Sequence, residues 1–463
     1  MKINVSPILI TLILVCLGFS PTLHAINPPP DGGYPGGNTA QGQNALLSLA
    51  TGTYNTGIGI YSLLSLTDGS FCTGVGAGTL LVNTADNGTA IGAGALLSNT
   101  VGEGNTATGA FALFSSTEGN DNTATGYSAL LSNTTGSENT AHGTFALFSN
   151  TTGTFNTAMG ASALFNNTTG NFNTAIGHQA LFNNTTGEGN TAIGDAALTS
   201  NTTGADNTAN GASALSSNTT GSQNTATGAG ALDSNTEGHS NMANGEAALQ
   251  ANITGSGNTA AGNVALFFST GDNNTALGAG AGGNVTTASN VICIGALVAG
   301  ANVSNSCYIG NIFGTTSSAG IAVFVNSDGK LGTATFSKRF KEDIKSMDRA
   351  SEALFSLKPV AFRYNKEIDP AGISQFGLVA EDVEKVNPNL VVRDKEGNPY
   401  SVRYDQVNAM LLNEFLKEHC KVQEQQKEID SLKAELKEQR DLIQKVSERV
   451  EMRKPEELLT KNP

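Results

Sequence analysis

The chain has 463 residues and a formal net charge of −14, and this charge is unevenly distributed. Lys and Arg are absent between Ile3 and Gly329, where 15 Asp and Glu occur, whereas the segment from Lys330 onward carries 24 basic and 24 acidic residues. A segment without cations does not neutralise phosphates, so nucleic-acid binding is excluded for the long first part. We also expect this part to be repelled by anionic membranes and anionic glycans.

The first residues have the pattern of an export signal. Lys2 precedes an apolar run from Ile8 to Phe19, and a cleavage site follows at Ala25. We therefore expect residues 1–25 to be a signal peptide, residues 26–37 to be a linker, and the protein to be secreted or at the cell surface. Later stretches do not reach 18 apolar residues, so no transmembrane segment is expected in the mature chain.

An Asn-Thr-Ala motif, once Asn-Met-Ala, recurs every 17 residues over more than half of the chain. The register extends back to Asn38 and forward to Asn274, with two steps shortened to 16 residues. Such a fixed short period indicates one supersecondary unit stacked many times. The asparagines of the regular part are Asn105, Asn122, Asn139, Asn156, Asn173, Asn190, Asn207, Asn224, Asn241 and Asn258.

The repeat has the consensus N-T-A-x-G-x-x-A-L-x-x-N-T-T-G-x-x, with apolar residues at its third, eighth and ninth places. Asn and Gly accept the positive φ angles of tight turns, and a helical repeat would need more Leu, Glu and Lys. The pattern predicts a β-solenoid over residues 38–310, with coils about 4.8 Å apart and Asn over Asn and Thr over Thr hydrogen-bonded. Its core residues are small, so either the stack is flattened or several chains share a core.

The run Asn-Thr-Ala-Ile-Gly, followed by Ala-Leu, resembles the head repeats of trimeric autotransporter adhesins over about residues 38–310. The resemblance implies a left-handed parallel β-roll, here with repeats of 16–17 residues, that associates in threes. The repeat is longer than the one usual in that family. A C-terminal membrane barrel is not recognisable, so we do not expect the autotransporter export route.

The chain changes character beyond the repeats. Residues 311–335 alternate apolar side chains before a Ser-Asp-Gly turn, which predicts a hairpin-like β adaptor. Residues 336–412 resemble the intramolecular chaperone domain at the C-terminus of phage endosialidase tail spikes. That resemblance implies a small α+β domain that trimerises a β-rich fibre and, in many members, then cleaves itself off. The stretches that carry it are Arg339–Ile344, Leu357–Val360, Gln375–Val383, Val402–Tyr404 and Leu411-Leu412.

Self-cleavage in that family uses a Ser nucleophile with a Lys five residues later. Alignment on Arg339 and Lys341 places Phe336 at the nucleophile position, so the base is retained and the nucleophile is not. Ser337 stands one residue late and could act only if the turn shifts. Lys341 would have to be neutral to take the hydroxyl proton, which requires burial or a nearby cation. Ser337 and Lys341 are the catalytic candidates, an uncleaved module is favoured, and Ser337 is alternatively a solvent-facing turn residue.

Residues 413–452 predict a coiled-coil helix, and residues 453–463 a flexible tail. The seam includes β-branched residues, which are compatible with a trimer, whereas polar residues weaken the other core position. The alternative is a single amphipathic helix packed on its own domain. The seam consists of Phe415, Val422, Ile429, Leu436, Ile443 and Val450, with Leu432 and Val446 between them and Glu418, Gln425 and Gln439 as its polar positions.

Other residue types give little chemistry. Cys293 and Cys307 lie in successive degenerate repeats, and the sequence leaves their pairing open. Five scattered histidines give no metal-ligand spacing, and the many Gly-x-Gly patterns lack the helix and acidic residue of a dinucleotide site. We expect neither a cofactor nor a metal.

Together these patterns predict a secreted, homotrimeric, adhesin-like fibre whose β-solenoid is assembled by its own C-terminal chaperone. Its expected partners are copies of itself and glycans or proteins of a host surface or matrix. Two alternatives stay open. One is a self-processing serine protease that acts only on itself, and the other is a solenoid whose ladders of Thr bind glycans or ice.

Overall fold

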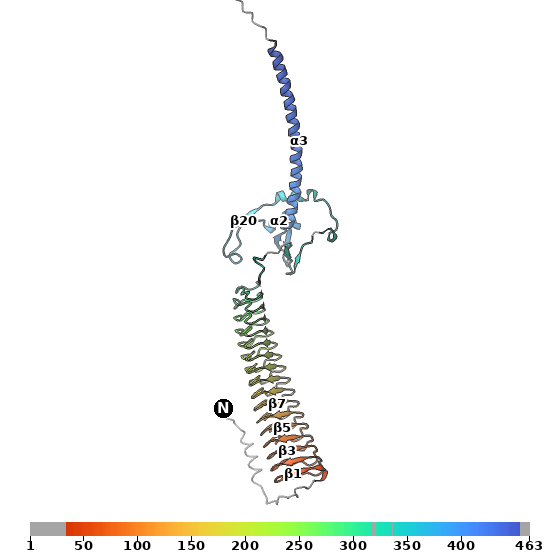
Figure 1. The fold of residues 1–463 in the computed structure, drawn as a ribbon, viewed down its shortest axis with the longest axis vertical. Helices are drawn as coiled ribbons and strands as arrows, with labels where there is room; N and C mark the ends of the chain where they lie inside the picture. Colours follow the sequence, from red (N-terminus) through yellow and green to blue (C-terminus); the bar gives the residue numbers. More distant parts are fainter. Residues whose placement is uncertain (1–33, 316–320, 336, 454–463) are drawn as a thin grey trace, which may run out of the picture. The chain divides into compact units, whose positions relative to one another are not determined.

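The computed structural model describes residues 34–315, 321–335 and 337–453 (Figure 1). The chain divides into two compact units, residues 1–315 and residues 316–463. The expected signal peptide, most of the linker, Phe336 and nearly all of the expected tail lie outside the described residues. Within the described residues, none of the helices is long and apolar enough to span a membrane.

The first unit is a parallel β-solenoid, as the repeat predicts (Figure 1). Each strand has three residues and pairs in parallel with the strand one coil further, for example Thr106 with Thr123. A 3-10 turn, η1 (Pro35–Gly37), precedes the first strand. The strands are β1 (Thr39–Gln41), β2 (Thr56–Ile58), β3 (Thr73–Val75), β4 (Thr89–Ile91), β5 (Thr106–Thr108), β6 (Thr123–Thr125), β7 (Thr140–His142), β8 (Thr157–Met159), β9 (Thr174–Ile176), β10 (Thr191–Ile193), β11 (Thr208–Asn210), β12 (Thr225–Thr227), β13 (Met242–Asn244), β14 (Thr259–Ala261), β15 (Thr275–Leu277), β16 (Ile292–Ile294) and β17 (Cys307–Ile309).

The core of the solenoid consists of the three apolar places of the repeat. In the coil that begins at Asn173, the side chains of Ala175, Ala180 and Leu181 are fully buried. The strand supplies one of them because alternate residues of a strand point to opposite faces, which leaves Thr174 and Ile176 on the outside. The predicted core residues are therefore confirmed, and equivalent side chains form continuous columns along the solenoid.

Two columns of buried Asn run beside the apolar core. In the first column, Asn122 donates from Nδ2 to Oδ1 of Asn105 at 3.1 Å and to the Gly136 carbonyl at 2.8 Å. In the second, Asn150 donates from Nδ2 to Oδ1 of Asn133 at 2.8 Å and to the Gly153 carbonyl at 3.0 Å. These bonds satisfy buried amides that would otherwise destabilise the coil, and they confirm the expected stacking of Asn over Asn.

The turn threonines stack in a different way from the one expected. The Thr134 hydroxyl donates to the backbone carbonyl of Thr151 at 3.0 Å, and Thr151 donates to the carbonyl of Thr168 at 2.9 Å. The hydroxyl therefore bonds to the backbone of the next coil, and not to the side chain of the equivalent Thr. A carbonyl has two lone pairs, so it accepts this bond in addition to a backbone bond.

Left-handed backbone conformations shape each coil. Gly160 has φ 139°, and a Cβ placed on it would lie 2.4 Å from the carbonyl oxygen of Gly177 in the next coil. This close backbone approach accounts for Gly at the fifth place of the repeat. The buried Leu also adopts positive φ, for example 51° at Leu181, which is unusual for a bulky side chain. We attribute its retention to the stacked coils on both sides.

The second unit is a small α+β assembly with three two-stranded antiparallel sheets. Its described core comprises Val383, Leu390, Val391, Val402, Val407 and Met410. The long helix α3 begins at Tyr404, before the expected coiled-coil segment, and its first turns contribute to this core. The elements are β18 (Val323–Val325), β19 (Leu331–Thr333), η2 (Lys338–Phe340), η3 (Asp348–Ser356), β20 (Val360–Phe362), β21 (Gln375–Gly377), α2 (Ala380–Val386), η4 (Pro388–Leu390), β22 (Val391–Arg393), β23 (Pro399–Val402) and α3 (Tyr404–Glu451).

Candidate functional site

The two catalytic candidates flank one short turn. Ser337 is the residue before η2, and its carbonyl accepts a backbone hydrogen bond from Phe340 at 3.0 Å. Lys341 is the residue after η2, and its N–H donates to the Lys338 carbonyl at 3.1 Å. Both residues are exposed. The Arg339 guanidinium lies over the Phe340 ring, 4.6 Å from its centroid, so this turn has a fixed cation on one side.

This geometry lacks burial, one of the two conditions that can activate the lysine of Ser-Lys chemistry. A lysine takes a proton from a hydroxyl only in its neutral form, which desolvation or a neighbouring cation favours. Lys341 is exposed in the single chain, so burial does not supply that condition. The position that aligns with the nucleophile, Phe336, lies outside the described residues. The uncleaved module therefore stays the prediction, with Ser337 and Lys341 as the candidates for the alternative of self-cleavage.

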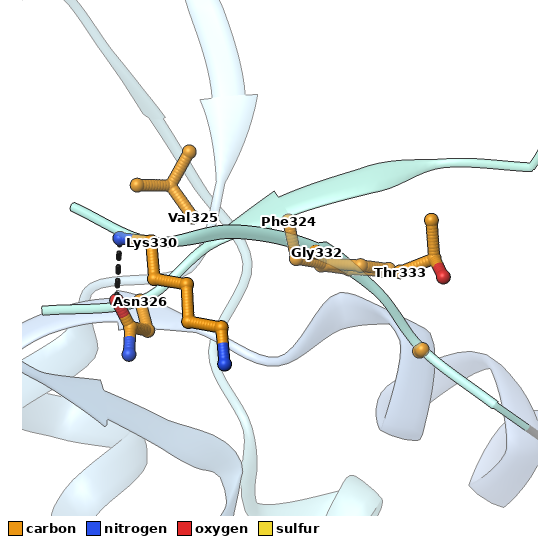
Figure 2. A pocket seen from close by; sticks show the side chains of 7 residues that line it. Phe324, Val325, Asn326, Lys330, Gly332 and Thr333 are labelled. Carbon is orange, nitrogen blue, oxygen red and sulfur yellow. Dashed lines mark hydrogen bonds between the residues drawn. The ribbon is translucent and has the colours of Figure 1, made fainter. Parts of the chain in front are cut away.

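The hairpin β18–β19 precedes this turn and carries an open hollow (Figure 2). Figure 2 shows the hairpin turn held by a hydrogen bond from the Lys330 N–H to Oδ1 of Asn326, at 2.8 Å. The hollow is lined by Phe324, Val325, Asn326, Lys330, Gly332, Thr333 and Ala334, and Lys330 is the ionisable residue among them. This lining offers neither a nucleophile beside a base nor a ligand set for a metal, so the hollow carries no chemistry of its own.

A polar cluster that the sequence did not reveal joins η3 to α3. The Ser351 side chain is fully buried, and its hydroxyl bonds to a carboxylate oxygen of Glu414. Asn413 donates from Nδ2 to this hydroxyl at 2.6 Å, and Lys417 donates from Nζ to Glu414 at 2.6 Å. These bonds hold the pKa of Glu414 below its usual value, with Lys417 the largest cause and Ser351 the next. Lys417 also donates from Nζ to the Ser351 hydroxyl at 3.3 Å, so the four side chains form one hydrogen-bonded cluster.

The chaperone-like stretches named from the sequence meet around Tyr404. The hydroxyl of Tyr404 accepts a hydrogen bond from the Leu378 N–H at 2.9 Å, which ties the start of α3 to the segment between β21 and α2. Gly377 lies beside it, since a Cβ there would be 3.0 Å from the Tyr404 hydroxyl. Arg403 donates from its N–H to the Leu390 carbonyl at 2.8 Å. The Gln375–Val383 and Val402–Tyr404 stretches thus form one packed unit.

The cysteines do not form a site. Cys293 pairs across the ladder with Tyr308, so the neighbouring Cys307 points to the opposite face of the sheet. Cys293 is buried, which raises the pKa of its thiol, while Cys307 is exposed, and both are free. Cys293 and Cys307 are therefore unpaired in the structure, whereas the sequence left their pairing open. Within the described residues, no group of three or more His, Cys, Asp or Glu is arranged to hold a metal ion.

The ladders of Thr on the strands do not form a continuous double row. The first place of the strands β1–β17 is Thr in most coils, but the third place is Thr only in β5, β6 and β12. The other strands hold residues such as Ile, Val, Met, His and Asn at that place. A regular Thr-x-Thr surface of the kind considered for ice binding is thus limited to three strands.

Comparison with known proteins identifies one similarity. No curated protein and no solved structure matches the chain. The resemblance of the solenoid to autotransporter heads therefore rests on the repeat and on its parallel coils. The part of the chain that begins at Ser337 and ends in β22 is similar to a known module. Residues 337–392 match the model of a family described as chaperone of endosialidase, in agreement with the resemblance drawn from the sequence motifs.

Proposed function

We propose that the chain is an exported homotrimeric fibre protein, adhesin-like, whose β-solenoid is assembled by its own C-terminal chaperone module. The observation that carries this proposal is the order of the two parts, because a match to the chaperone of endosialidase directly follows a long solenoid. Glycans or proteins of a host surface or matrix are its proposed targets. The expected export signal is the support for a secreted or cell-surface location.

Exposed apolar side chains of the second unit support the trimer. Phe376 is 86% exposed, and Phe355 and Tyr400 are each 76% exposed. The hairpin β18–β19 also exposes Val323, Val325 and Leu331. A two-stranded hairpin alone is marginally stable in water, and large exposed apolar groups mark contact surfaces. Copies of the same unit would cover these groups.

The seam of α3 supports the same oligomer. Its apolar residues recur every seven positions and remain exposed in the single chain, with Ile429 at 44% and Ile443 at 69%. Association of three helices would bury them as knobs in the holes of the partner helices. Ala434 lies on the same helix outside this seam, so it offers a matched position for a control.

Analytical ultracentrifugation of the chain without residues 1–25 tests the proposal. We expect the mass of three chains. We expect Ile429→Asp to shift the distribution toward monomer, because a carboxylate would be buried in the seam, and Ala434→Asp to leave the trimer intact. A stable monomer at micromolar concentration, with the helix formed, would overturn the proposal.

Self-processing is the second candidate, and the retained Lys341 beside Ser337 is the observation that favours it. The two candidates differ in intact mass, since cleavage would create a new N-terminus near residue 337. We expect the full-length mature chain. If a shortened chain appears and Ser337→Ala abolishes it while Ser346→Ala does not, the module is self-processing and the uncleaved alternative is wrong.

A further inference from the structure

One side of the solenoid carries an apolar row over nine successive coils. The row is formed by the residue that follows the buried Leu of each coil, and backbone bonds such as the one from the Ser149 N–H to the Phe165 carbonyl, at 3.0 Å, stack its members. In the next four coils the same place holds Thr199, Ser216, Asp233 and Gln250. We call the following residues the apolar stripe: Leu47, Leu64, Leu81, Leu97, Phe114, Leu131, Phe148, Phe165 and Phe182.

Aromatic rings form the middle of the apolar stripe and stack face to face on one another. The Phe165 ring stacks on Phe148 with centroids 4.9 Å apart and on Phe182 with centroids 5.1 Å apart. Phe145 meets Phe148 and Phe165 edge to face. A glycan would need a free aromatic ring face on which to stack. Both faces of the Phe165 ring are covered, one by Phe148 and the other by Phe182. Ring edges suit contacts with further aromatic and aliphatic side chains.

The charges of the solenoid avoid the apolar stripe. Up to Glu188, every acidic residue that the structure describes lies in the last turn of a coil, between the second column of buried Asn and the next strand. In later coils, Asp233 occupies the position that directly follows the buried Leu. Asp195 and Glu246 lie in the turn that contains this position in their own coils. The residues of the first group are Asp68, Asp86, Glu103, Glu118, Asp121, Glu138 and Glu188.

The positions of the acidic residues determine through which face a second copy of the solenoid can approach. Residues 4–329 contain no Lys or Arg, so two copies of the solenoid repel each other wherever acidic turns meet. An uncharged apolar surface is where they can approach closely. The outer face of the strands is also uncharged, but its third-place row is interrupted at Thr108, Thr125 and His142. The apolar stripe runs over nine coils without a polar residue, about 40 Å at the usual strand spacing. Phe114 is buried in it, 6% exposed, beneath the ring of Phe111.

We infer that the apolar stripe is the face on which copies of this chain pack against one another along the first nine coils. The copies lie parallel, with their stripes in the same register and their acidic last turns directed outward. This inference rests on the proposed homotrimer and adds the surface through which the solenoids meet. It also places the four coils that hold Thr199, Ser216, Asp233 and Gln250 at this place outside that contact.

Site-directed cross-linking tests the inference on the full chain. Ser149→Cys places a thiol beside the stripe residue Phe148, and Thr152→Cys places one on the last turn of the same coil, away from the stripe. The background has Cys16, Cys307 and Cys420 replaced by Ser, while the buried Cys72 and Cys293 remain. With a short thiol-reactive linker we expect covalent dimers and trimers from Ser149→Cys and uncross-linked chains from Thr152→Cys.

Sedimentation of the same samples distinguishes a wrong contact face from a wrong oligomeric state. Trimers that cross-link through Thr152→Cys, through both positions or through neither would overturn the assigned face while the trimeric fibre stands. Monomers would overturn the face and the proposed function together. Among the residues that the structure describes, the side chains of Ser149 and Thr152 make no hydrogen bond, so we expect both variants to keep the native circular dichroism spectrum.

Discussion

Single side chains decide how well neighbouring coils hold together, and the second column of buried Asn, from Asn83 to Asn252, is broken at Ser116 and ends at Ser269. Ser116 and Ser269 occupy positions that hold Asn in most coils. Within the described residues, the Oδ1 atoms of Asn99 and Asn252 and the Ser116 hydroxyl are buried without a hydrogen-bond partner. A buried polar group left unpaired costs about 1–3 kcal/mol. These two coils are therefore the weakest links of the column.

Ser116→Asn is expected to repair the break in this column. Its Nδ2 would donate to Oδ1 of Asn99, and its own Oδ1 would accept from Nδ2 of Asn133, as in the regular coils. We expect stabilisation of about 1–2 kcal/mol, read as a higher urea midpoint of the β-sheet circular dichroism signal. The neighbouring Ser115→Asn places the same amide outside the coil and serves as the control. An unchanged or lower midpoint for Ser116→Asn would contradict the ladder account.

Gly160→Ala is expected to separate two coils. The new Cβ would lie 2.4 Å from the Gly177 carbonyl oxygen, and the residue would keep a positive φ. We expect destabilisation by more than about 1 kcal/mol, seen as a lower urea midpoint. Gly283→Ala is the matched control, since its nearest neighbour would be 3.5 Å away. Equal midpoints for the two variants would show that the glycine column is not required by close packing.

At this scale the sequence predicted the core but not the polar contacts of the second unit. The 17-residue period alone identified Ala175, Ala180 and Leu181, because identical coils bury identical places. The bonds of Ser351 to Asn413 and Glu414 join residues 62 and 63 positions apart, so no local pattern signals them. The gaps at Ser116 and Ser269 were visible in the sequence as departures from the repeat, but their meaning required the direction of each hydrogen bond.

Among the elements, α3 has two distinct parts. Its first turns pack on the core of the second unit through Val407 and Met410, and the Ser351 cluster fixes it to η3. Its later turns carry the exposed apolar seam. The heptad pattern predicted a helix, but it placed the start at residue 413, because the first turns follow the packing of their own domain and not the seven-residue period.

Acid is expected to loosen the contact between η3 and α3. The folded-state pKa of Glu414 is lowered, so its ionised form stabilises the fold above about pH 4.3, the ordinary value for Glu, and this stabilisation is lost as the pH falls through the folded-state value. Glu414→Gln should therefore lower the melting temperature near neutral pH and reduce its fall toward about pH 3. The helical circular dichroism signal reports the melting temperature.

Glu424→Gln provides the comparison on the same helix. Glu424 is exposed and lies outside the seam and outside the Ser351 cluster. We expect the melting temperature of this variant to follow the wild-type profile with pH. If Glu414→Gln and Glu424→Gln have the same profile, the Ser351 cluster does not anchor the helix.

The whole molecule consists of two units with opposite chemistry. The solenoid has no cationic side chain and obtains its order from bonds between successive coils of one chain, whereas the second unit has balanced charge and exposes much of its apolar surface. The repeat predicted the first architecture except for the partners of the turn Thr hydroxyls, because each coil copies its neighbours. The second unit is not periodic, and its motifs were interpretable only by resemblance.

Trypsin is expected to separate the two units cleanly. Cleavage requires Lys or Arg, so residues 26–329 should remain in one fragment whether folded or unfolded, while the second unit is digested. We expect the fragment to keep its β-sheet circular dichroism signal, because its hydrogen bonds lie between its own coils. Mass spectrometry and the spectrum after digestion check both points. Loss of the signal from an intact fragment would show that the solenoid depends on the second unit to stay folded.

The second column of buried Asn also conflicts with N-linked glycosylation. Several of its members begin an Asn-Thr-Thr sequence, which is an acceptor for this modification in a eukaryotic secretory pathway. Their side chains are fully buried and their Nδ2 atoms donate hydrogen bonds inside the coil, so a sugar attached there would prevent the coil from closing. Modification and folding of these coils therefore exclude each other, and a eukaryotic secretory host should yield misfolded chain where a bacterial host yields the solenoid. The asparagines concerned are Asn133, Asn150, Asn167, Asn184, Asn201 and Asn218.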